Sequence, residues 1–330
     1  MEFSRLGRTG LQVSRICLGT MTFGLQCDEP TSFAILDRAA EGGVTFLDAA
    51  DVYPLGGGLE TVGRTEEILG RWLKGKRDRF AVATKCSGVM GPSRWDRGNS
   101  RKHIVEAVEA SLRRLGTDRI DLYQLHAPDP QAPIEETILA LDHLVASGKV
   151  LYVGCSNFLA YQVALALGWS RALRLARFDS VQPRYNLLFR QIERELLPLC
   201  AEEGVGVIPY NPLAGGLLSG KHDPGGSPAE GTRFTLGTAG AMYQGRYWHE
   251  REFATVGALA PLAAEAGTSL VTLAVAWVLA NPAITSAIVG ASRPEQLDAS
   301  LAAADLALDG DLKARMDDLT AEYRLGDAAR

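Results

Sequence analysis

Several features that identify other classes of protein are missing from this 330-residue sequence. Its five cysteines are an odd number and include no CxxC pair, which argues against a disulfide framework or a zinc site. The net charge of −5 provides no basic field for nucleic acid. The N-terminus lacks an apolar signal core, and the most apolar late stretch, VTLAVAWVLA, is too short to span a bilayer. We therefore expect a cytoplasmic protein that binds no metal, nucleic acid or membrane.

Motifs for two common kinds of nucleotide site are also missing. No GxGxxG follows a strand-like segment, so a Rossmann domain is not supported. The segment GGLLSGKH (215–222) fits GxxxxGK, but His222 stands where a P-loop needs Ser or Thr to bind Mg²⁺. A nucleoside triphosphatase is therefore disfavoured. The same glycines could instead cradle a pyrophosphate with exposed backbone N–H groups while Lys221 neutralises its charge.

The sequence does contain a regular alternation of strand-like apolar runs and helical patterns. Apolar residues make up 46% and charged residues 22%, as in globular domains. Several helical patterns end in glycine, as helix C-caps do. The expected strands are 16–20, 45–50, 80–86, 120–126, 150–157, 179–186, 206–212 and 284–291. Eight alternating βα units predict an α/β fold, a closed (β/α)8 barrel that forms a single domain over 1–330.

Other segments depart from this repeat. The two short runs around Thr9-Gly10 predict an N-terminal β-hairpin that plugs the barrel bottom. Long loops follow the third and seventh strands, at 87–101 and 213–252, and extra helices are expected near the C-terminus. Since long loops in compact domains are usually functional, we expect substrate lids, with surface elaboration as the alternative. Their aromatic residues, Trp95, Tyr243, Tyr247 and Trp248, suggest an aromatic-lined mouth.

Four polar residues lie at or just past the ends of three consecutive expected strands: Asp48, Tyr53, Lys85 and His126. Because barrel enzymes place their chemistry at the carboxyl ends of the strands, these side chains should meet on one rim. The ammonium of Lys85 would lower the pKa of Tyr53 from roughly 10 and make it a usable acid. Asp48 would keep Lys85 protonated, and His126 would orient a substrate oxygen. Taken singly, each residue also has a structural explanation, as a cap, a packing residue or a solvated charge.

At this point the sequence resembles a family, the aldo-keto reductases, over nearly its whole length. The resemblance is carried by FLDAADVY, ATKCSG, DLYQLHAPD, VGCSNF, VQPRYNLL and IPYNPLAGGLLSGK. It is greatest to the branch that includes voltage-gated potassium channel β-subunits and many bacterial reductases. It implies an NADP-dependent oxidoreductase that reduces a small carbonyl substrate, such as an aldehyde, a ketone or a keto-sugar. Asp48, Tyr53, Lys85 and His126 would form its catalytic tetrad, and Trp95 would line the substrate pocket with Tyr53 and His126. The alternative is an NADP(H)-sensing subunit with little turnover.

The resemblance also implies a site for the nicotinamide of the cofactor. Ser156, Asn157 and Gln182 would hydrogen-bond the carboxamide, and the ring of Tyr210 would stack on the nicotinamide. Further cofactor contacts are implied for Thr20, Met21, Asp48, Asn211, Pro212, Leu213, Gly215, Lys221, Arg233 and Gly290.

A second anion site is expected after the eighth strand, where Ser292 and Arg293 precede a helix. A helix N-terminus with these side chains and Gln296 suits the 2′-phosphate of NADP, and simple helix capping is the alternative reading. The sequence departs from the branch at Ala299 and Ser300, where Glu and Asn usually contact the adenine. We therefore expect an altered adenine contact and more cofactor selectivity from the phosphate site.

Overall fold

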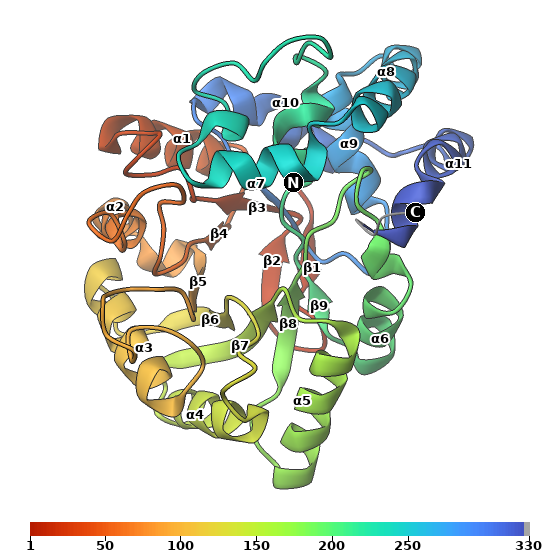
Figure 1. The fold of residues 1–330 in the computed structure, drawn as a ribbon. Helices are drawn as coiled ribbons and strands as arrows, with labels where there is room; N and C mark the ends of the chain where they lie inside the picture. Colours follow the sequence, from red (N-terminus) through yellow and green to blue (C-terminus); the bar gives the residue numbers. More distant parts are fainter. Residues whose placement is uncertain (327–330) are drawn as a thin grey trace.

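The structure, a computed structural model, describes residues 1–326 and contains an eight-stranded parallel sheet (Figure 1). Its strands are β3 (Ile16–Gly19), β4 (Phe46–Asp48), β5 (Ala81–Cys86), β6 (Ile120–Leu125), β7 (Val150–Ser156), β8 (Phe178–Gln182), β9 (Gly206–Val207) and β10 (Ala287–Val289). The order is β10-β3-β4-β5-β6-β7-β8-β9. Parallel bridges from Val207 to Ile284 and from Tyr210 to Ile288 join the two edges. The predicted (β/α)8 barrel is therefore confirmed.

Helices follow the strands and cover the outside of the barrel (Figure 1). They are α1 (Glu29–Glu41), α2 (Arg64–Leu73), α3 (Arg101–Leu115), α4 (Ile134–Ala146), α5 (Ala160–Leu173), α6 (Leu196–Glu203), α8 (Glu250–Glu265) and α9 (Leu270–Leu279). The predicted glycine ends are present; α3, for example, stops at Gly116, whose left-handed φ of 62° lets its N–H bond to carbonyls of the last turn. Within residues 1–326 no single helix is long and apolar enough to cross a membrane, and α8 with α9 reaches that length only across a 91° bend.

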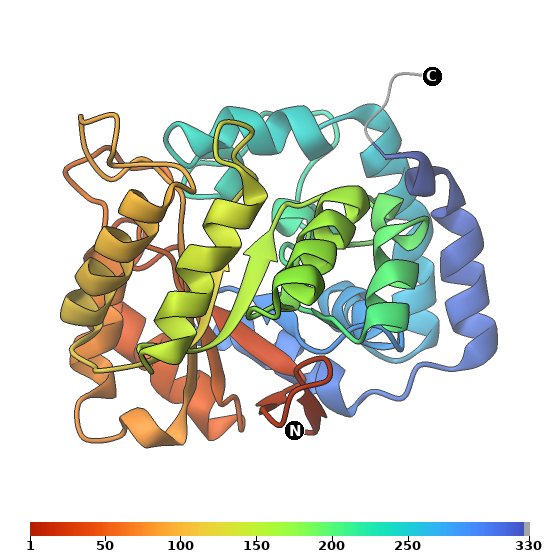
Figure 2. The same cartoon turned by 90° about the horizontal axis from the view of Figure 1, so that it is seen from below.

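The predicted N-terminal hairpin closes one end of the barrel. Strands β1 (Phe3–Arg5) and β2 (Gln12–Ser14) pair antiparallel, and Leu6 and Val13 are completely buried against side chains inside the barrel. A side chain at Gly7 would lie 2.6 Å from the carbonyl oxygen of Gly204, so only glycine fits this close approach. Figure 2 shows the hairpin at one end of the molecule and the segment after β9 at the other. The open end is therefore the rim at the carboxyl ends of the strands.

The segment after β9 is more ordered than the predicted loop 213–252. It contains short 3-10 turns and a helix, α7 (Ala239–Tyr247), which its two internal glycines did not suggest. Tertiary packing stabilises this helix, because Tyr243 and Tyr247 are buried on one face and the Tyr247 hydroxyl accepts hydrogen bonds from two asparagine side chains. The expected additional C-terminal helices are α10 (Leu297–Ala302) and α11 (Gly310–Leu319).

Candidate active site

A buried ion pair forms the floor of the site. Lys85 on β5 places its Nζ 2.6 Å from Oδ2 of Asp48 on the neighbouring strand β4, and 2.8 Å from the carbonyl oxygen of Ala49. The exposed fraction is 0% for Lys85 and 2% for Asp48. Burial acts to lower the pKa of Lys85, but the charges of Asp48 and Tyr53 outweigh it, so the net pKa is raised. Lys85 is therefore a fixed cation at neutral pH.

The second carboxylate oxygen of Asp48 is held by two amides from other strands. Gln182 on β8 donates to Oδ1 at 2.9 Å, and Gln124 on β6 donates to the same atom at 3.2 Å. Gln182 was expected to hold the cofactor, whereas Gln124 was not singled out from the sequence. Its signal was a lone amide in the apolar run IDLYQLH, where a buried polar group needs a partner. The two amides fix the orientation of the carboxylate.

Tyr53 and His126 lie together above this pair. Their ring centroids are 5.7 Å apart with the rings nearly perpendicular, and Nζ of Lys85 lies 5.0 Å from the centroid of the Tyr53 ring. The backbone N–H of His126 donates to the carbonyl oxygen of Cys86 at 2.7 Å, which holds the end of β6 against β5. The structure therefore brings together the four side chains that the sequence predicted to share one rim.

The pKa of Tyr53 differs from the simple electrostatic expectation. Burial raises it and outweighs the lowering effect of the Lys85 charge, so the pKa of Tyr53 rises to about 12. The predicted net lowering is wrong for the protein alone, because the tyrosine is only 8% exposed and desolvation disfavours the phenolate. Burial and the positive charge of Lys85 together lower the pKa of His126 to about 3. At neutral pH the site thus contains a protonated phenol and a neutral imidazole.

A long cleft of about 1080 Å³ opens above these residues, at the upper limit of typical ligand pockets. Asp48, Tyr53 and His126 line it, as do nearly all of the residues expected to contact a cofactor. These are Met21, Ser156, Asn157, Gln182, Tyr210, Asn211, Pro212, Leu213, Gly215, Lys221, Arg233, Gly290, Ser292, Arg293 and Gln296. The cleft therefore connects the tetrad with both of the expected anion-binding segments.

Three of the expected site residues do not line the cleft, and the first of them, Lys85, is completely buried below it. Thr20 is completely buried and donates its hydroxyl to the carbonyl oxygen of Asp48 at 2.9 Å, so it supports the floor from behind. Trp95, expected in the substrate pocket, is 56% exposed and lies beside the cationic ends of Arg94 and Lys102. Of the other expected mouth aromatics, Tyr243 lines the cleft and Tyr247 is buried beneath it, whereas Trp248 does not line it and packs against Phe234 and Phe253.

Residues at the end of the cleft where the nicotinamide was expected form one hydrogen-bonded group. The Tyr210 hydroxyl donates to Oδ1 of Asn157 at 2.8 Å, and the Ser156 hydroxyl donates to the carbonyl oxygen of Gln182 at 2.8 Å. Asn157 has a left-handed φ of 62°, which is uncommon outside glycine and occurs often at functional sites. This arrangement gathers amide, hydroxyl and aromatic groups at the ends of β7, β8 and β9, which suits a flat ring that carries a carboxamide.

The other end of the cleft carries positive charge. Lys221, Arg233 and Arg293 all line the cleft, as do the acidic residues Glu230 and Glu295, and none of the three cations forms an ion pair within residues 1–326. The N–H and hydroxyl groups of Ser292 both donate to the side-chain oxygen of Gln296, at 2.9 and 3.2 Å, which shapes the turn before α10. Unpaired cations around a shaped turn fit a ligand with several phosphate groups.

The glycine-rich segment contributes to this end differently from the prediction. The N–H of Gly215 donates to Oδ1 of Asn211 at 2.6 Å, and the N–H of Gly216 donates to the carbonyl oxygen of Leu213 at 2.8 Å. These N–H groups are satisfied within the turn, so the expected backbone cradle for a pyrophosphate does not involve them. The groups left to attract a phosphate at this end are side chains such as Lys221, which lines the cleft.

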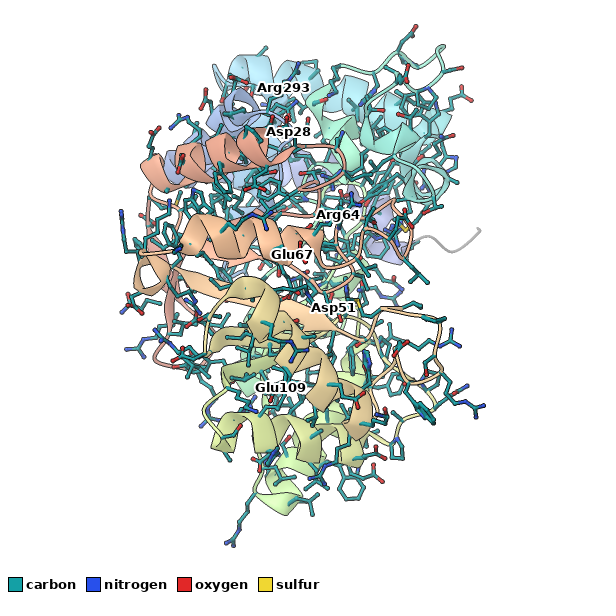
Figure 3. All side chains as sticks on the ribbon, turned by 90° about the vertical axis from the view of Figure 1, so that its left-hand side faces the viewer. Asp28, Asp51, Arg64, Glu67, Glu109 and Arg293 are labelled. Carbon is teal, nitrogen blue, oxygen red and sulfur yellow. The ribbon has the colours of Figure 1, made fainter. Side chains whose placement is uncertain are left out.

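Beside the tetrad lies a buried carboxyl that sequence reasoning did not single out. Asp51, labelled in Figure 3, is completely buried, and its backbone N–H donates to the carbonyl oxygen of Lys85 at 3.1 Å. Neither carboxylate oxygen has a partner of normal hydrogen-bond geometry among residues 1–326, and the Val52 N–H compensates only in part. Burial, followed by the negative charge of Glu66, raises the pKa of Asp51 well above its ordinary value. We therefore expect a neutral acid at this position.

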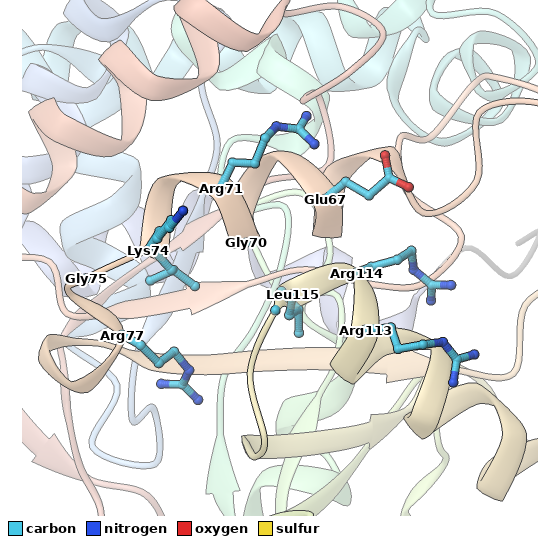
Figure 4. A pocket seen from close by; sticks show the side chains of 11 residues that line it. Glu67, Gly70, Arg71, Lys74, Gly75, Arg77, Arg113, Arg114 and Leu115 are labelled. Carbon is cyan, nitrogen blue, oxygen red and sulfur yellow. The ribbon is translucent and has the colours of Figure 1, made fainter.

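A second hollow of about 610 Å³ lies on the outside of the barrel between α2 and α3 (Figure 4). Three of its cations already pair with carboxylates: Arg71 with Glu29, Arg77 with Asp121 and Arg114 with Glu66. Arg71, Arg113 and Arg114 lie in the last turns of these helices, where cations complement the helix dipole. No residue of the tetrad lines this hollow, and we interpret its charge as structural.

Comparison with known proteins agrees with this geometry. The model of the Aldo/keto reductase family matches residues 15–321, and the chain belongs to that family of oxidoreductases. It is 38% identical to the uncharacterized oxidoreductase YrpG of Bacillus subtilis over 97% of this chain and 96% of that protein. It is also 38% identical to a probable voltage-gated potassium channel subunit beta of Arabidopsis thaliana, over 93% and 92% of the two chains. Identity to Protein tas of Escherichia coli is 34%, over 96% and 97%.

Proposed function

We propose that this protein uses NADPH to reduce an aldehyde or ketone, such as a keto-sugar, to an alcohol in the cytoplasm. The observation that carries the proposal is the buried pair of Lys85 and Asp48 beneath Tyr53, on the floor of a cleft whose far end is cationic. All five cysteines of the protein are buried and free, which supports a location in a reducing compartment such as the cytoplasm. The family match supports the reaction class, and the charge distribution in the cleft supports the choice of cofactor.

The chain's own residues would handle the proton and the developing negative charge. NADPH would supply a hydride to the carbonyl carbon, and Tyr53 would donate its phenolic proton to the carbonyl oxygen. Lys85 would stabilise the phenolate that remains, and Asp48 would keep this ammonium charged. The neutral imidazole of His126, 5.7 Å from the phenol ring between centroids, would donate a hydrogen bond that orients the substrate oxygen.

The cofactor would lie along the cleft. Its carboxamide would bond to Ser156 and Asn157, and Tyr210 would lie against the nicotinamide ring. Arg293 and Ser292 would hold the 2′-phosphate, which is why we expect NADPH to be preferred over NADH. Ala299 lines the cleft and Ser300 is buried. Because neither side chain is charged, the adenine would meet no charged group at these two positions.

The test is a panel of aldehydes, ketones and keto-sugars with purified protein, followed at the NADPH absorbance. We expect many turnovers per chain on at least one carbonyl compound, and loss of that turnover in Tyr53→Phe. Oxidation of no more than one equivalent of NADPH per chain across the panel would contradict a reductase.

That negative result would favour a second candidate, an NADP(H)-sensing subunit with little turnover. The plant relatives named as potassium channel β-subunits, at 38% identity, are the observation that favours it. A sensor would bind NADP(H) with an unchanged cationic site and still fail to turn over good aldehydes. Measuring cofactor binding and turnover on the same sample therefore separates the two functions.

A further inference from the structure

One outer helix of the barrel has almost no polar residues on the side that faces water. Helix α5 has the sequence AYQVALALGWSRAL, and Arg171 is its only charged residue. Surface helices normally combine one apolar face with one charged face, and a helix that is apolar all round is normally buried. Helix α5 nevertheless lies on the outside of the barrel in Figure 1. The composition of α5 therefore predicts that a second molecule packs against its outward-facing side.

The exposed residues of α5 form two parallel rows along the helix. Large side chains recur every four residues at Tyr161, Leu165, Trp169 and Leu173, and their exposed fractions are 65%, 52%, 37% and 44%. Small residues recur with the same spacing at Ala164, Gly168 and Ala172, and all three are exposed. A side chain built at Gly168 would meet no atom within 4 Å, so there is open space above the middle of the small row. We call these seven residues the α5 face.

The α5 face is complementary to itself. Rows of residues four apart form the ridges and grooves by which helices pack, commonly with axes that cross at about −50°. Two copies related by a two-fold axis near Gly168 would each place their large row in the small row of the other. The face carries no charge, so like charges would not meet across this axis. Arg171 at its edge is already paired with Glu203 on α6, at 3.0 Å.

The size of the α5 face also fits a second copy. With Leu159, which is 59% exposed at the start of the helix, its large side chains expose on the order of 500 Å². A standard stable interface buries ~800 Å² on each partner. The α5 face would therefore form the apolar centre of such an interface, and the residues around it would form the polar rim. A membrane surface suits it less well, because helices that bind membranes usually carry several Lys or Arg beside the apolar face.

We propose that the α5 face is the centre of a two-fold interface between two copies of this protein. The proposal is independent of the catalytic assignment, since no residue of α5 lines the cleft. The chain therefore forms a homodimer whose two clefts act separately.

The test is the mass of the intact protein by analytical ultracentrifugation at protein concentrations between about 1 and 50 µM. An interface of standard size should hold two chains together at these concentrations. We expect wild type to sediment as two chains. Leu165→Glu introduces a charge at both sides of the interface and should raise the dissociation constant by ~100-fold or more. The matched control is Leu319→Glu on α11, which alters a leucine of similar exposure, 41%, and should leave the dimer intact. Circular dichroism and turnover confirm that both variants remain folded.

A cross-linking variant tests the geometry. All five native cysteines are buried, so Gly168→Cys adds the only thiol that can react readily among the described residues. We expect mild oxidation to link Gly168→Cys into covalent dimers, while Leu319→Cys stays unlinked. The proposal is overturned if wild type sediments as one chain at 50 µM, if Leu165→Glu remains dimeric, or if Gly168→Cys links no faster than Leu319→Cys. Monomeric wild type that binds lipid vesicles through this face would overturn it as well.

Discussion

The ammonium of Lys85 lies 2.6 Å from Oδ2 of Asp48, in a place that water does not reach. Charges so deeply buried are tolerated only as a pair, because their mutual attraction offsets much of the cost of removing both from water. The pair holds the cation below Tyr53 and therefore influences the reactivity of the phenol as well as the stability of the barrel.

Lys85→Met is expected to lose most of its activity and to be destabilised by about 3–5 kcal/mol, because Asp48 is left as an unpaired buried charge. Urea unfolding and kcat on one aldehyde measure both effects. The double variant Asp48→Asn with Lys85→Met should recover stability without recovering rate. Lys74→Met, which removes an exposed lysine that forms no ion pair with residues 1–326, is the control. A near-normal kcat in Lys85→Met would show that the chemistry lies elsewhere.

Tyr53→Phe is expected to lower kcat by about 10²–10⁴-fold, the usual contribution of a general acid. The phenylalanine keeps the packing of the ring against His126, so the Kd for NADPH should stay within about twofold of wild type. Single-turnover rates and fluorescence titration of the cofactor give the two numbers. Wild-type rates would remove Tyr53 from the mechanism.

Arg293→Ala should reduce the preference for NADPH over NADH by about 10–100-fold, since a charge-assisted contact to phosphate contributes roughly 1.5–3 kcal/mol. The ratio of the two Kd values is the measurement. Arg113→Ala removes an arginine from the hollow between α2 and α3 that forms no ion pair among the described residues, and it should leave that ratio unchanged. A ratio near one in wild type would place the 2′-phosphate site elsewhere.

His126 should not titrate in the working range of the enzyme, because burial and the Lys85 charge lower its pKa to about 3. The plot of kcat/KM against pH is therefore expected to lack an inflection from this imidazole between about pH 5 and 8. The unfolded chain takes up a proton on this residue below about pH 6.5 and the folded chain does not, so this residue lowers stability as the pH falls through that value. An inflection near neutrality that disappears in His126→Gln would contradict the neutral imidazole.

Asp51→Asn should become more stable relative to wild type as the pH rises. The raised pKa of Asp51 keeps it protonated in the folded chain while the unfolded chain ionises, so wild type loses stability as the pH rises above the unfolded pKa. Asparagine removes this dependence. Melting temperatures of both proteins at pH 5 and pH 8 test the prediction, and a constant difference between them would contradict a neutral Asp51.

The sequence was most informative about residues whose positions are set by the regular succession of strands in the barrel. Asp48 and Lys85 end adjacent parallel strands, so their contact could be expected from the order of strands alone. The alternation of strands and helices predicted the barrel, and the turn residues Thr9-Gly10 predicted the hairpin.

The sequence was least informative where three-dimensional packing determines the local structure or the pKa of a side chain. The helix over Ala239–Tyr247 contains two glycines and depends on buried tyrosines that lie far from their partners in the chain. The direction of the Tyr53 pKa shift depends on burial, which no local pattern reports. Trp95 lies on the expected loop, but its side chain turns toward cationic neighbours outside the cleft.

Asp48 accepts hydrogen bonds from side chains of β5, β6 and β8, so one carboxylate ties four strands of the barrel together. A change in the position of this group would require several strands to separate at once. Local opening of the catalytic floor therefore costs nearly as much as complete unfolding. Heat inactivation and loss of structure should coincide, and no folded but inactive species should accumulate below the melting temperature.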